Sequence, residues 1–152
     1  MLFRSKMHEG LRIAAITRSI DPYDALISKT GASLDKLPWG AVIGTSSLRR
    51  KEQLKRYRSD FHIKDIRGNI EERLALLDKT ENLDAIVIAA CGLIRLELEH
   101  RITQKIPFDI LKPHFLQGSL AIVVKRDQKE LLNLLSILDA RKKIIFLESV
   151  FQ

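Results

Sequence analysis

The pattern that most constrains the fold is a strand, a polar loop and a helix in succession, repeated three times between residues 41 and 101. One strand segment, 85–90, is an unbroken apolar run, as is typical of a sheet covered on both faces. The predicted strands are 41–43, 61–66 and 85–90, and the predicted helical segments are 48–57, 70–77 and 93–101. This alternation predicts an α/β sheet, in which ligands bind at the carboxyl ends of the strands.

Further elements flank the repeated pattern. A strand is predicted over 11–17, and turn residues beginning at Asp21 open the next element at Asp24, with a boundary near 18–22. Toward the other end, 119–124 is predicted to be a buried strand. Asp127 and Glu130 are predicted to cap a Leu-rich helix over about 128–138.

Composition excludes several classes of protein. With 45% hydrophobic and 30% charged residues, the 152-residue chain is predicted to be globular rather than disordered. Its one cysteine cannot form an internal disulfide, and its four His lack the paired spacing of a metal site, so a reducing, cytoplasmic setting without a metal is expected. The longest uncharged apolar stretch, 85–94, is roughly half of what a bilayer requires, so neither a membrane span nor export is expected.

The positive charge is concentrated in one part of the chain. Residues 44–73 hold nine basic and five acidic residues, within a chain of net charge +7. Such a segment favours an anionic partner, which leaves nucleic acid, phosphate, anionic lipid and small polycarboxylates open. A nucleic-acid-binding module is the weakest of these, because few aromatic residues beyond Tyr57 and Phe61 interleave with the basic ones.

The first loop, Thr45-Ser46-Ser47, joins a strand end to a helix start. Free backbone N–H groups, hydroxyls and the positive helix end could hold an anion there, although an ordinary N-cap is the simpler interpretation. Arg49 and Arg50 favour the anion, because cations in a first helical turn oppose the macrodipole at a cost of about 0.3–1 kcal/mol each. A bound anion would offset that cost, and Arg grips a carboxylate in a bidentate fork.

The second loop repeats the theme with Arg67, Gly68 and Asn69 at a strand end and Arg73 one turn into the next helix. Asn69 and Glu72 have the spacing of a capping box. The alternative is that both arginines are solvated and pair with Glu71 or Glu72. Two such loops at neighbouring strand ends would face the same site.

Three other residues are weaker candidates. Arg95 follows Gly92 and could join the site, although a lone Arg on a helix is usually solvated. Gln117 precedes the last predicted strand, where it is otherwise part of a tight turn. Cys91 is interpreted as a small core residue rather than a nucleophile, because no His lies at a recognisable spacing.

Three segments in order, 42–50, 66–74 and 84–93, resemble the hydroxymethylbilane synthase family, also called porphobilinogen deaminase. Residues 8–11 and 21–26 resemble the stretch leading into the second domain of that family, and 117–122 resembles its Gly-Gln-Gly strand. The resemblance covers nearly the whole chain.

The resemblance implies a cytoplasmic, monomeric transferase of haem and porphyrin biosynthesis. The family joins four porphobilinogen molecules head to tail with loss of ammonia, primed on a dipyrromethane cofactor that is bound to a Cys. Substrate and growing pyrrole chain carry acetate and propionate groups, and no metal, nucleic acid or membrane is implied. The positions that match cofactor- or substrate-binding residues are Thr45, Ser46, Ser47, Arg49, Arg50, Arg67, Gly68, Asn69, Arg73, Gly92, Arg95 and Gln117.

The sequence also departs from the family. The Lys-Asp-x-Pro segment that supplies the catalytic Asp has no counterpart at residues 5–8, so no catalytic residue is assigned. Residues 146–151 resemble the element just before the cofactor-bearing Cys loop of the family, and that loop is absent. Cys91 cannot replace the cofactor-bearing Cys, because it aligns with a small residue of the family. Leu116 and Ser149 replace a Gly and an Arg. The chain is therefore expected to be inactive alone, as part of a longer enzyme or as a non-catalytic anion-binding remnant.

The family resemblance implies a periplasmic-binding-protein-like sheet with helices on both faces for the second domain, together with pieces of the other two domains. The predicted domains are a remnant of domain one over 1–18, domain two over 19–113, a return strand and helix of domain one over 114–139, and a stump of domain three over 140–152. Only domain two is expected to have its own core. Strands 11–17 and 119–124 should pair with each other or with little else.

Overall fold

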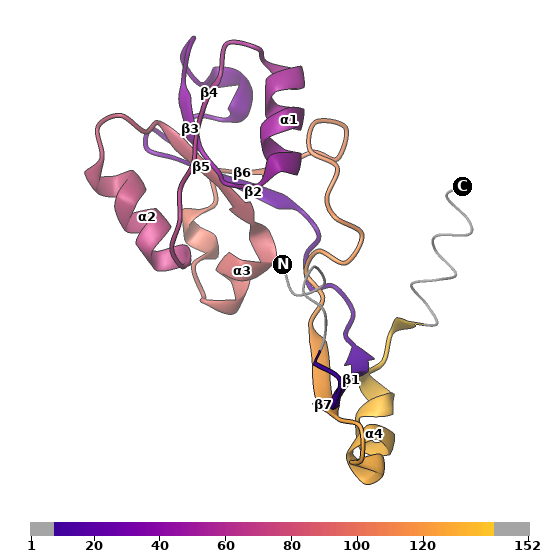
Figure 1. Cartoon of the computed structure of the whole chain (residues 1–152). Helices are drawn as coiled ribbons and strands as arrows, with labels where there is room; N and C mark the ends of the chain where they lie inside the picture. Colours follow the sequence, from indigo (N-terminus) through magenta and orange to yellow (C-terminus); the bar gives the residue numbers. More distant parts are fainter. Residues whose placement is uncertain (1–7, 142–152) are drawn as a thin grey trace. The chain divides into compact units, whose positions relative to one another are not determined.

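A computed structural model describes residues 8–141, which fold into two compact units (Figure 1). The first unit contains residues 8–20 and 119–141, and the second spans Asp21–Gly118. No helix in the described range is long and apolar enough to cross a membrane. The prediction for 146–151 and most of the predicted domain-three segment lie outside the described residues. The assignment of the two units to family domains stays a prediction.

The second unit is built on a mixed five-stranded sheet of order β4-β3-β5-β2-β6. β3 runs parallel to β4 and β5, whereas β2 runs antiparallel to β5 and β6. The strands are β2 (Asp24–Ser28), β3 (Val42–Gly44), β4 (His62–Lys64), β5 (Ala85–Ala89) and β6 (Gln104–Ile106). Three of them were predicted, and the element predicted to open at Asp24 is strand β2, which lies between β5 and β6. β6 was not predicted, since three residues at a sheet edge carry too little pattern.

The helices of this unit follow the predicted segments closely. α1 spans Leu48–Tyr57 as predicted, and α2 spans Ile70–Lys79, two residues longer than predicted at its end. α3 spans Ala90–Arg95, so the prediction that Cys91 and Gly92 lie before the helix is wrong. A short 3₁₀ helix, Glu99–Arg101, takes up the rest of the predicted segment, and another spans Leu34–Lys36.

Helices cover both faces of this sheet, and α1 and α2 lie on opposite sides of it in Figure 1. Along β5, Val87 packs in the cluster that contains Leu54 of α1, whereas Ile86 packs in the other cluster with Leu77 of α2 and Leu93 of α3. Successive strand residues point to opposite faces, so an unbroken apolar strand serves two hydrophobic clusters at once. The mixed α/β architecture predicted from the sequence is confirmed.

Arg58 and Asp60 hold the loop before β3 against the start of β4. The Arg58 Nη2 lies 2.7 Å from Asp60 Oδ2, and the Gly40 N–H donates to the same oxygen at 2.9 Å. Arg58 also donates to the Leu37 carbonyl at 2.9 Å, and its guanidinium lies 4.3 Å from the centre of the Phe61 ring. The hydrogen bond from Arg58 lowers the pKa of the Asp60 carboxyl from 3.8 to about 2.

The first unit is a two-stranded antiparallel sheet of β1 (Leu11–Ile16) and β7 (Ala121–Lys125), followed by α4 (Lys129–Leu135) and a 3₁₀ turn, Ser136–Leu138. This confirms the predicted pairing of the two strands. The predicted cap by Asp127 and Glu130 is wrong, because Gln128 is the N-cap and makes no side-chain cap bond. Asp127 instead accepts a hydrogen bond from Lys129 N–H through its backbone carbonyl.

Apolar burial differs sharply between the units. Among the described residues, both clusters of buried hydrophobic side chains lie in the second unit. In the first unit, Leu134 and Ile137 are 71% and 86% exposed. Two strands and one short helix bury too little apolar surface to be stable independently.

Amide hydrogen exchange is expected to be faster in β1 and β7 than in β5. A two-stranded sheet with exposed apolar neighbours opens at a lower free energy than a strand buried on both faces. Residue-resolved exchange of the whole chain measures this directly. Protection of β1 and β7 equal to that of Ala85–Ala89 would contradict the expectation.

Asp60 should make the stability of the second unit sensitive to acid. Its depressed pKa stabilises the fold above pH about 4, and this contribution is lost as the pH falls from about 4 toward about 2. Urea unfolding of the wild type and Asp60→Asn should therefore give a stability difference that shrinks in that window. A difference that does not change with pH would show that the Asp60 charge is not responsible.

Candidate anion-binding site

The predicted loops meet at one edge of the sheet. The parallel strands β3, β4 and β5 have their carboxyl ends at this edge, where the first two loops and helix α3 begin. β2 runs in the opposite direction, so it begins where the others end, and its first residue, Asp24, pairs with Ala89 and Ile106. A carboxylate is thereby brought to the edge where the sequence predicted only anion-binding groups.

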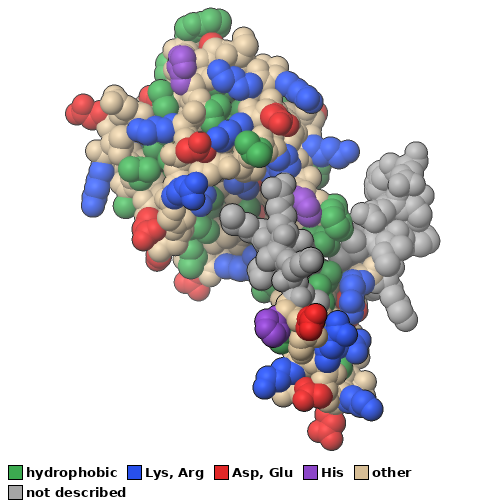
Figure 2. Space-filling view, in the orientation of Figure 1, with side chains coloured by type: hydrophobic (Ala, Val, Ile, Leu, Met, Phe, Trp, Pro, Cys, Tyr) green, Lys and Arg blue, Asp and Glu red, His purple; other side chains and the backbone are tan. Residues whose placement is uncertain are grey.

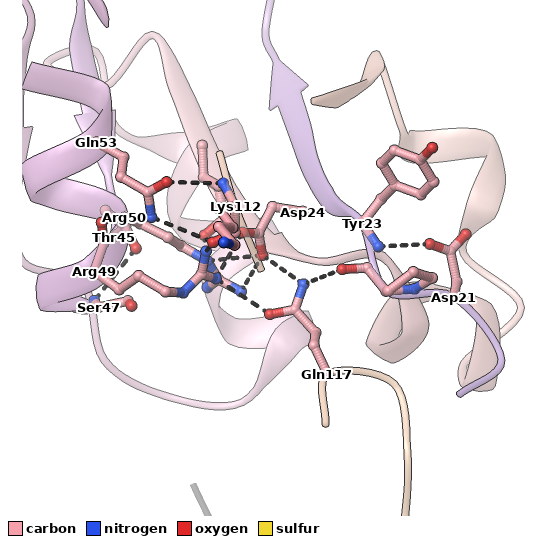
Figure 3. Close-up of polar contacts among 12 residues, drawn as sticks. Asp21, Tyr23, Asp24, Thr45, Ser47, Arg49, Arg50, Gln53, Lys112 and Gln117 are labelled. Carbon is pink, nitrogen blue, oxygen red and sulfur yellow. Dashed lines mark hydrogen bonds and ion pairs between the residues drawn. The ribbon is translucent and has the colours of Figure 1, made fainter. Parts of the chain in front are cut away.

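Asp24 lies at the centre of this edge and is fully buried. Its Oδ2 accepts a hydrogen bond from Arg49 Nη2 at 2.6 Å. Its Oδ1 accepts from Arg50 Nε at 3.0 Å and Nη2 at 2.6 Å, and the Arg50 Nη1 donates to the Val87 carbonyl at 3.3 Å (Figure 3). One carboxylate therefore joins two adjacent arginines.

Gln117 belongs to the same group of contacts. Its Nε2 donates to Asp24 Oδ1 at 3.0 Å and to the Pro22 carbonyl at 2.7 Å, and its Oε1 accepts from Arg49 Nη2 at 3.2 Å (Figure 3). Arg49 Nη1 in turn donates to the Lys112 carbonyl at 2.5 Å. The long segment after β6 is thus fastened to the start of β2 and to α1.

These contacts correct one step of the sequence argument. The charges in the first turn of α1 do not require an external anion, because Asp24 supplies a carboxylate to Arg49 and Arg50, and Asp65 supplies one to Lys51 at 2.6 Å. The hydrogen bond from Lys51 lowers the pKa of Asp65. The macrodipole argument was sound, but the offsetting anions come from the chain itself.

The hydroxyl groups of the first loop have separate environments. Thr45 is buried, and its Oγ1 accepts from the Ser47 N–H at 3.4 Å. The Ser46 Oγ donates to the Ile66 carbonyl at 2.5 Å. Ser47 stands at the N-cap position of α1 without a side-chain cap bond, so the ordinary N-cap interpretation does not describe it.

In the second loop, Asn69 makes the predicted capping box with Glu72, in which both hydrogen bonds measure 2.8 Å. Gly68 has a φ of +105°, a conformation that favours glycine. Arg73 Nε donates to the Gly68 carbonyl at 2.8 Å, and Arg67 is exposed. Neither arginine forms an ion pair with Glu71 or Glu72 in the described part of the chain, so the predicted pairing is not observed.

Helix α3, which follows β5 directly, contributes Gly92 and Arg95. A Cβ on Gly92 would lie 2.5 Å from the end of the Ile70 side chain, so this glycine lets α3 and α2 approach closely. Arg95 Nη2 donates to the Gly118 carbonyl at 2.8 Å, which brings Arg95 beside the segment that holds Gln117. The two loops and α3 thus supply predicted residues to one edge of the sheet.

Local pairing takes up much of the positive charge of 44–73. Of the nine basic residues there, Arg49, Arg50, Lys51 and Arg58 form ion pairs with Asp residues. Figure 2 shows Lys and Arg side chains interspersed with Asp and Glu on the visible face. Charge density alone therefore does not identify a ligand.

The sequence analysis assigns no role in the site to Asp24 or to Asp65. Asp24 belongs to a predicted turn, although a carboxylate directly before the apolar residues 25–27 is a signal that it enters the protein interior. A buried carboxylate needs cationic partners, and the Arg49-Arg50 pair was the strongest cationic feature without an assigned partner.

Residues 3–133 match the family model described as "Porphobilinogen deaminase, dipyromethane cofactor binding domain". The chain belongs to the porphobilinogen deaminase family. Its resemblance to this family, stated from three motifs, is confirmed.

Two relatives show the extent of the similarity. The porphobilinogen deaminase of Pelotomaculum thermopropionicum is 45% identical over 149 residues, which cover 97% of this chain and 47% of that protein. The porphobilinogen deaminase of Brevibacillus brevis is 46% identical over 135 residues, covering 89% and 43%. The chain spans about half the length of the curated relatives it matches.

Among solved structures, an amino acid ABC transporter substrate-binding protein of Streptococcus pneumoniae covers 90% of this chain and 56% of its own, with 15% identity and a TM-score of 0.42. At this TM-score the match carries no argument. The periplasmic-binding-protein-like architecture stays a prediction for this porphobilinogen deaminase family member.

Gly68→Ala should destabilise the chain by about 2–3 kcal/mol. The positive φ alone costs about 1 kcal/mol, and the new Cβ would lie 2.3 Å from Glu72 Oε2, which would displace Glu72 from the capping box. Gly31→Ala is the matched control, since Gly31 has a φ of +71° and no atom within 4 Å of the added Cβ. Equal losses in urea unfolding would contradict the assigned role of the capping box.

Proposed function

We propose that this chain forms part of a porphobilinogen deaminase and there binds the carboxylate groups of porphobilinogen and of the linear pyrrole chain. Family membership and the collection of predicted residues at one sheet edge support this. The reaction of such an enzyme is a transferase step of porphyrin biosynthesis that releases ammonia. Because the chain spans about half the length of its relatives, this activity belongs to the proposal.

The ligand chemistry follows from the arginines of the edge. Every pyrrole unit carries an acetate and a propionate, and a guanidinium binds a carboxylate through two parallel N–H donors. Arg67 is exposed, Arg95 is exposed apart from its contact with Gly118, and the Arg49 side chain is 27% exposed while held by Asp24. These three arginines are proposed to contact carboxylates, with Thr45, Ser46, Ser47, Gly68, Asn69, Arg73, Gly92 and Gln117 completing the site together with Arg50.

A dipyrromethane fits this edge only in part. Its carboxylates suit the arginines, and when bound it supplies the primer for chain growth in this family. Its thioether needs an accessible thiol, whereas Cys91, the one cysteine of the 152 residues, is 7% exposed and lies inside α3. We therefore assign Cys91 no role in attachment.

The 152 residues alone are proposed to bind porphobilinogen without polymerising it. They contain no Lys-Asp-x-Pro segment and no accessible cysteine. The second candidate function, a non-catalytic anion-binding protein, is supported by the arginines gathered at the same edge. A monomeric state and a cytoplasmic location are part of the proposal for either function.

Isothermal titration of the chain with porphobilinogen, together with an absorbance assay for tetrapyrrole, tests the proposal. Binding without tetrapyrrole is expected, and Arg67→Gln should weaken binding about tenfold, the value of one charge-assisted hydrogen bond. Arg101→Gln is the matched control, because Arg101 pairs with Asp78 and precedes the amino end of β6.

Two results would contradict the proposal. An absence of porphobilinogen binding would remove the proposed role of the edge in carboxylate recognition. Tetrapyrrole formation by the 152 residues would show that neither the Lys-Asp-x-Pro segment nor an accessible thiol is needed.

A further inference from the structure

We infer that Asp24 is a positioning residue, which fixes the guanidinium groups of Arg49 and Arg50 in the orientation that receives a ligand carboxylate. This inference rests on the proposed function, because it assigns Asp24 a part in carboxylate binding at the same edge. The apolar residues 25–27 after Asp24 indicate that it is buried, but they do not indicate its partners.

The two oxygens of Asp24 are divided between the two arginines. Oδ1 lies 2.6 Å from Arg50 Nη2 and Oδ2 lies 2.6 Å from Arg49 Nη2. The Asp24 carboxylate is planar, and it belongs to the buried first residue of β2. It therefore fixes the orientation of both guanidinium groups at once. Neither arginine could rotate without breaking a charge-assisted hydrogen bond to a buried partner.

Backbone carbonyls hold the same guanidiniums from other sides. Arg50 Nη1 donates to the Val87 carbonyl at 3.3 Å, and Arg49 Nη1 donates to the Lys112 carbonyl at 2.5 Å. A free Arg side chain has many rotamers, and here much of that freedom is lost on folding rather than on binding. The arginines are therefore preorganised for a ligand.

Charge balance is the second effect of Asp24. Two adjacent guanidiniums repel each other, and the single carboxylate reduces their combined charge from +2 to +1. The remaining positive charge attracts a carboxylate ligand, while the pair stays ordered in its absence. Arg49 is 27% exposed and Arg50 11%, so both lie at the border between interior and solvent.

Gln117 supports the same arrangement from the segment after β6. It donates to Asp24 Oδ1 at 3.0 Å and accepts from Arg49 Nη2 at 3.2 Å, so it links the carboxylate to one of the two arginines. A substitution of Gln117 should therefore produce a weaker form of the effect of substituting Asp24.

Porphobilinogen titration of Asp24→Asn at low and high salt tests the inference. The added positive charge alone would tighten binding, whereas loss of positioning weakens it, so the two effects have opposite signs. We expect about tenfold weaker binding at physiological salt and a steeper decline as salt is added. The steeper salt dependence follows from the lost negative charge alone, so the weaker binding at physiological salt is the result that reports loss of positioning.

Asp60→Asn is the matched control for Asp24→Asn. Asp60 is likewise a carboxylate with little exposure, paired with Arg58 at 2.7 Å in the same unit, but it lies before β4 rather than at the carboxyl ends. The Asp60→Asn variant should be less stable than the wild type, but its affinity for porphobilinogen should change by no more than about twofold. Unchanged or tighter binding by Asp24→Asn would overturn the inference.

Two further measurements cover the remaining outcomes. If Asp24→Asn does not fold, Gln117→Met should bind porphobilinogen about threefold more weakly, and unchanged affinity would overturn the inference. If the wild type does not bind porphobilinogen, the proposed function fails, and NMR exchange of the arginine Nε–H groups decides the positioning. The inference is supported if the Arg50 Nε–H exchanges slowly in the wild type and fast in Asp24→Asn or Gln117→Met. Equal exchange rates in the wild type and the variant would overturn the inference.

Discussion

A buried carboxylate on β2 holds together the segments that form the candidate site. Asp24 binds Arg49 and Arg50 of α1 and Gln117 of the segment after β6, although these residues are distant in sequence. Breaking a buried ion pair by removing one partner costs about 3–5 kcal/mol, so these contacts bear on stability as well as on binding. The Asp24 carboxylate thus has two roles, since it orients the two arginines for a ligand and attaches α1 to the sheet.

The strand order explains why this carboxylate reaches the site. A sheet of parallel strands alone would bring loops and helix starts to its carboxyl edge, as β3, β4 and β5 do. β2 lies antiparallel between β5 and β6, and only a strand of that direction can begin at the same edge. The mixed topology therefore adds an acidic residue to an edge where the loops supply arginines and hydroxyls.

Much of this arrangement could be predicted from the sequence, for identifiable reasons. The apolar run 85–90 and the helix at 48–57 have clear periodicity, and Asn69 with Glu72 is a local cap that tertiary contacts do not override. β6 has only three residues, too few for a recognisable periodicity. Asp127 does not cap α4, because its backbone carbonyl accepts a hydrogen bond from the Lys129 N–H instead. Asp24 could not be assigned, because its partners are fixed by strand direction, which periodicity does not encode.

Carboxylate ligands are proposed to bind at the carboxyl edge of the second unit. Backbone amide NMR of the 152-residue chain during titration with porphobilinogen tests this binding most directly. Saturable shifts are expected at residues 45–50, 67–69, 92–95 and 117–118, which form this edge through β3, β4, β5 and the Asp24 contacts. Shifts confined to the first unit or to the opposite edge near Arg58, or no shifts at all, would contradict it.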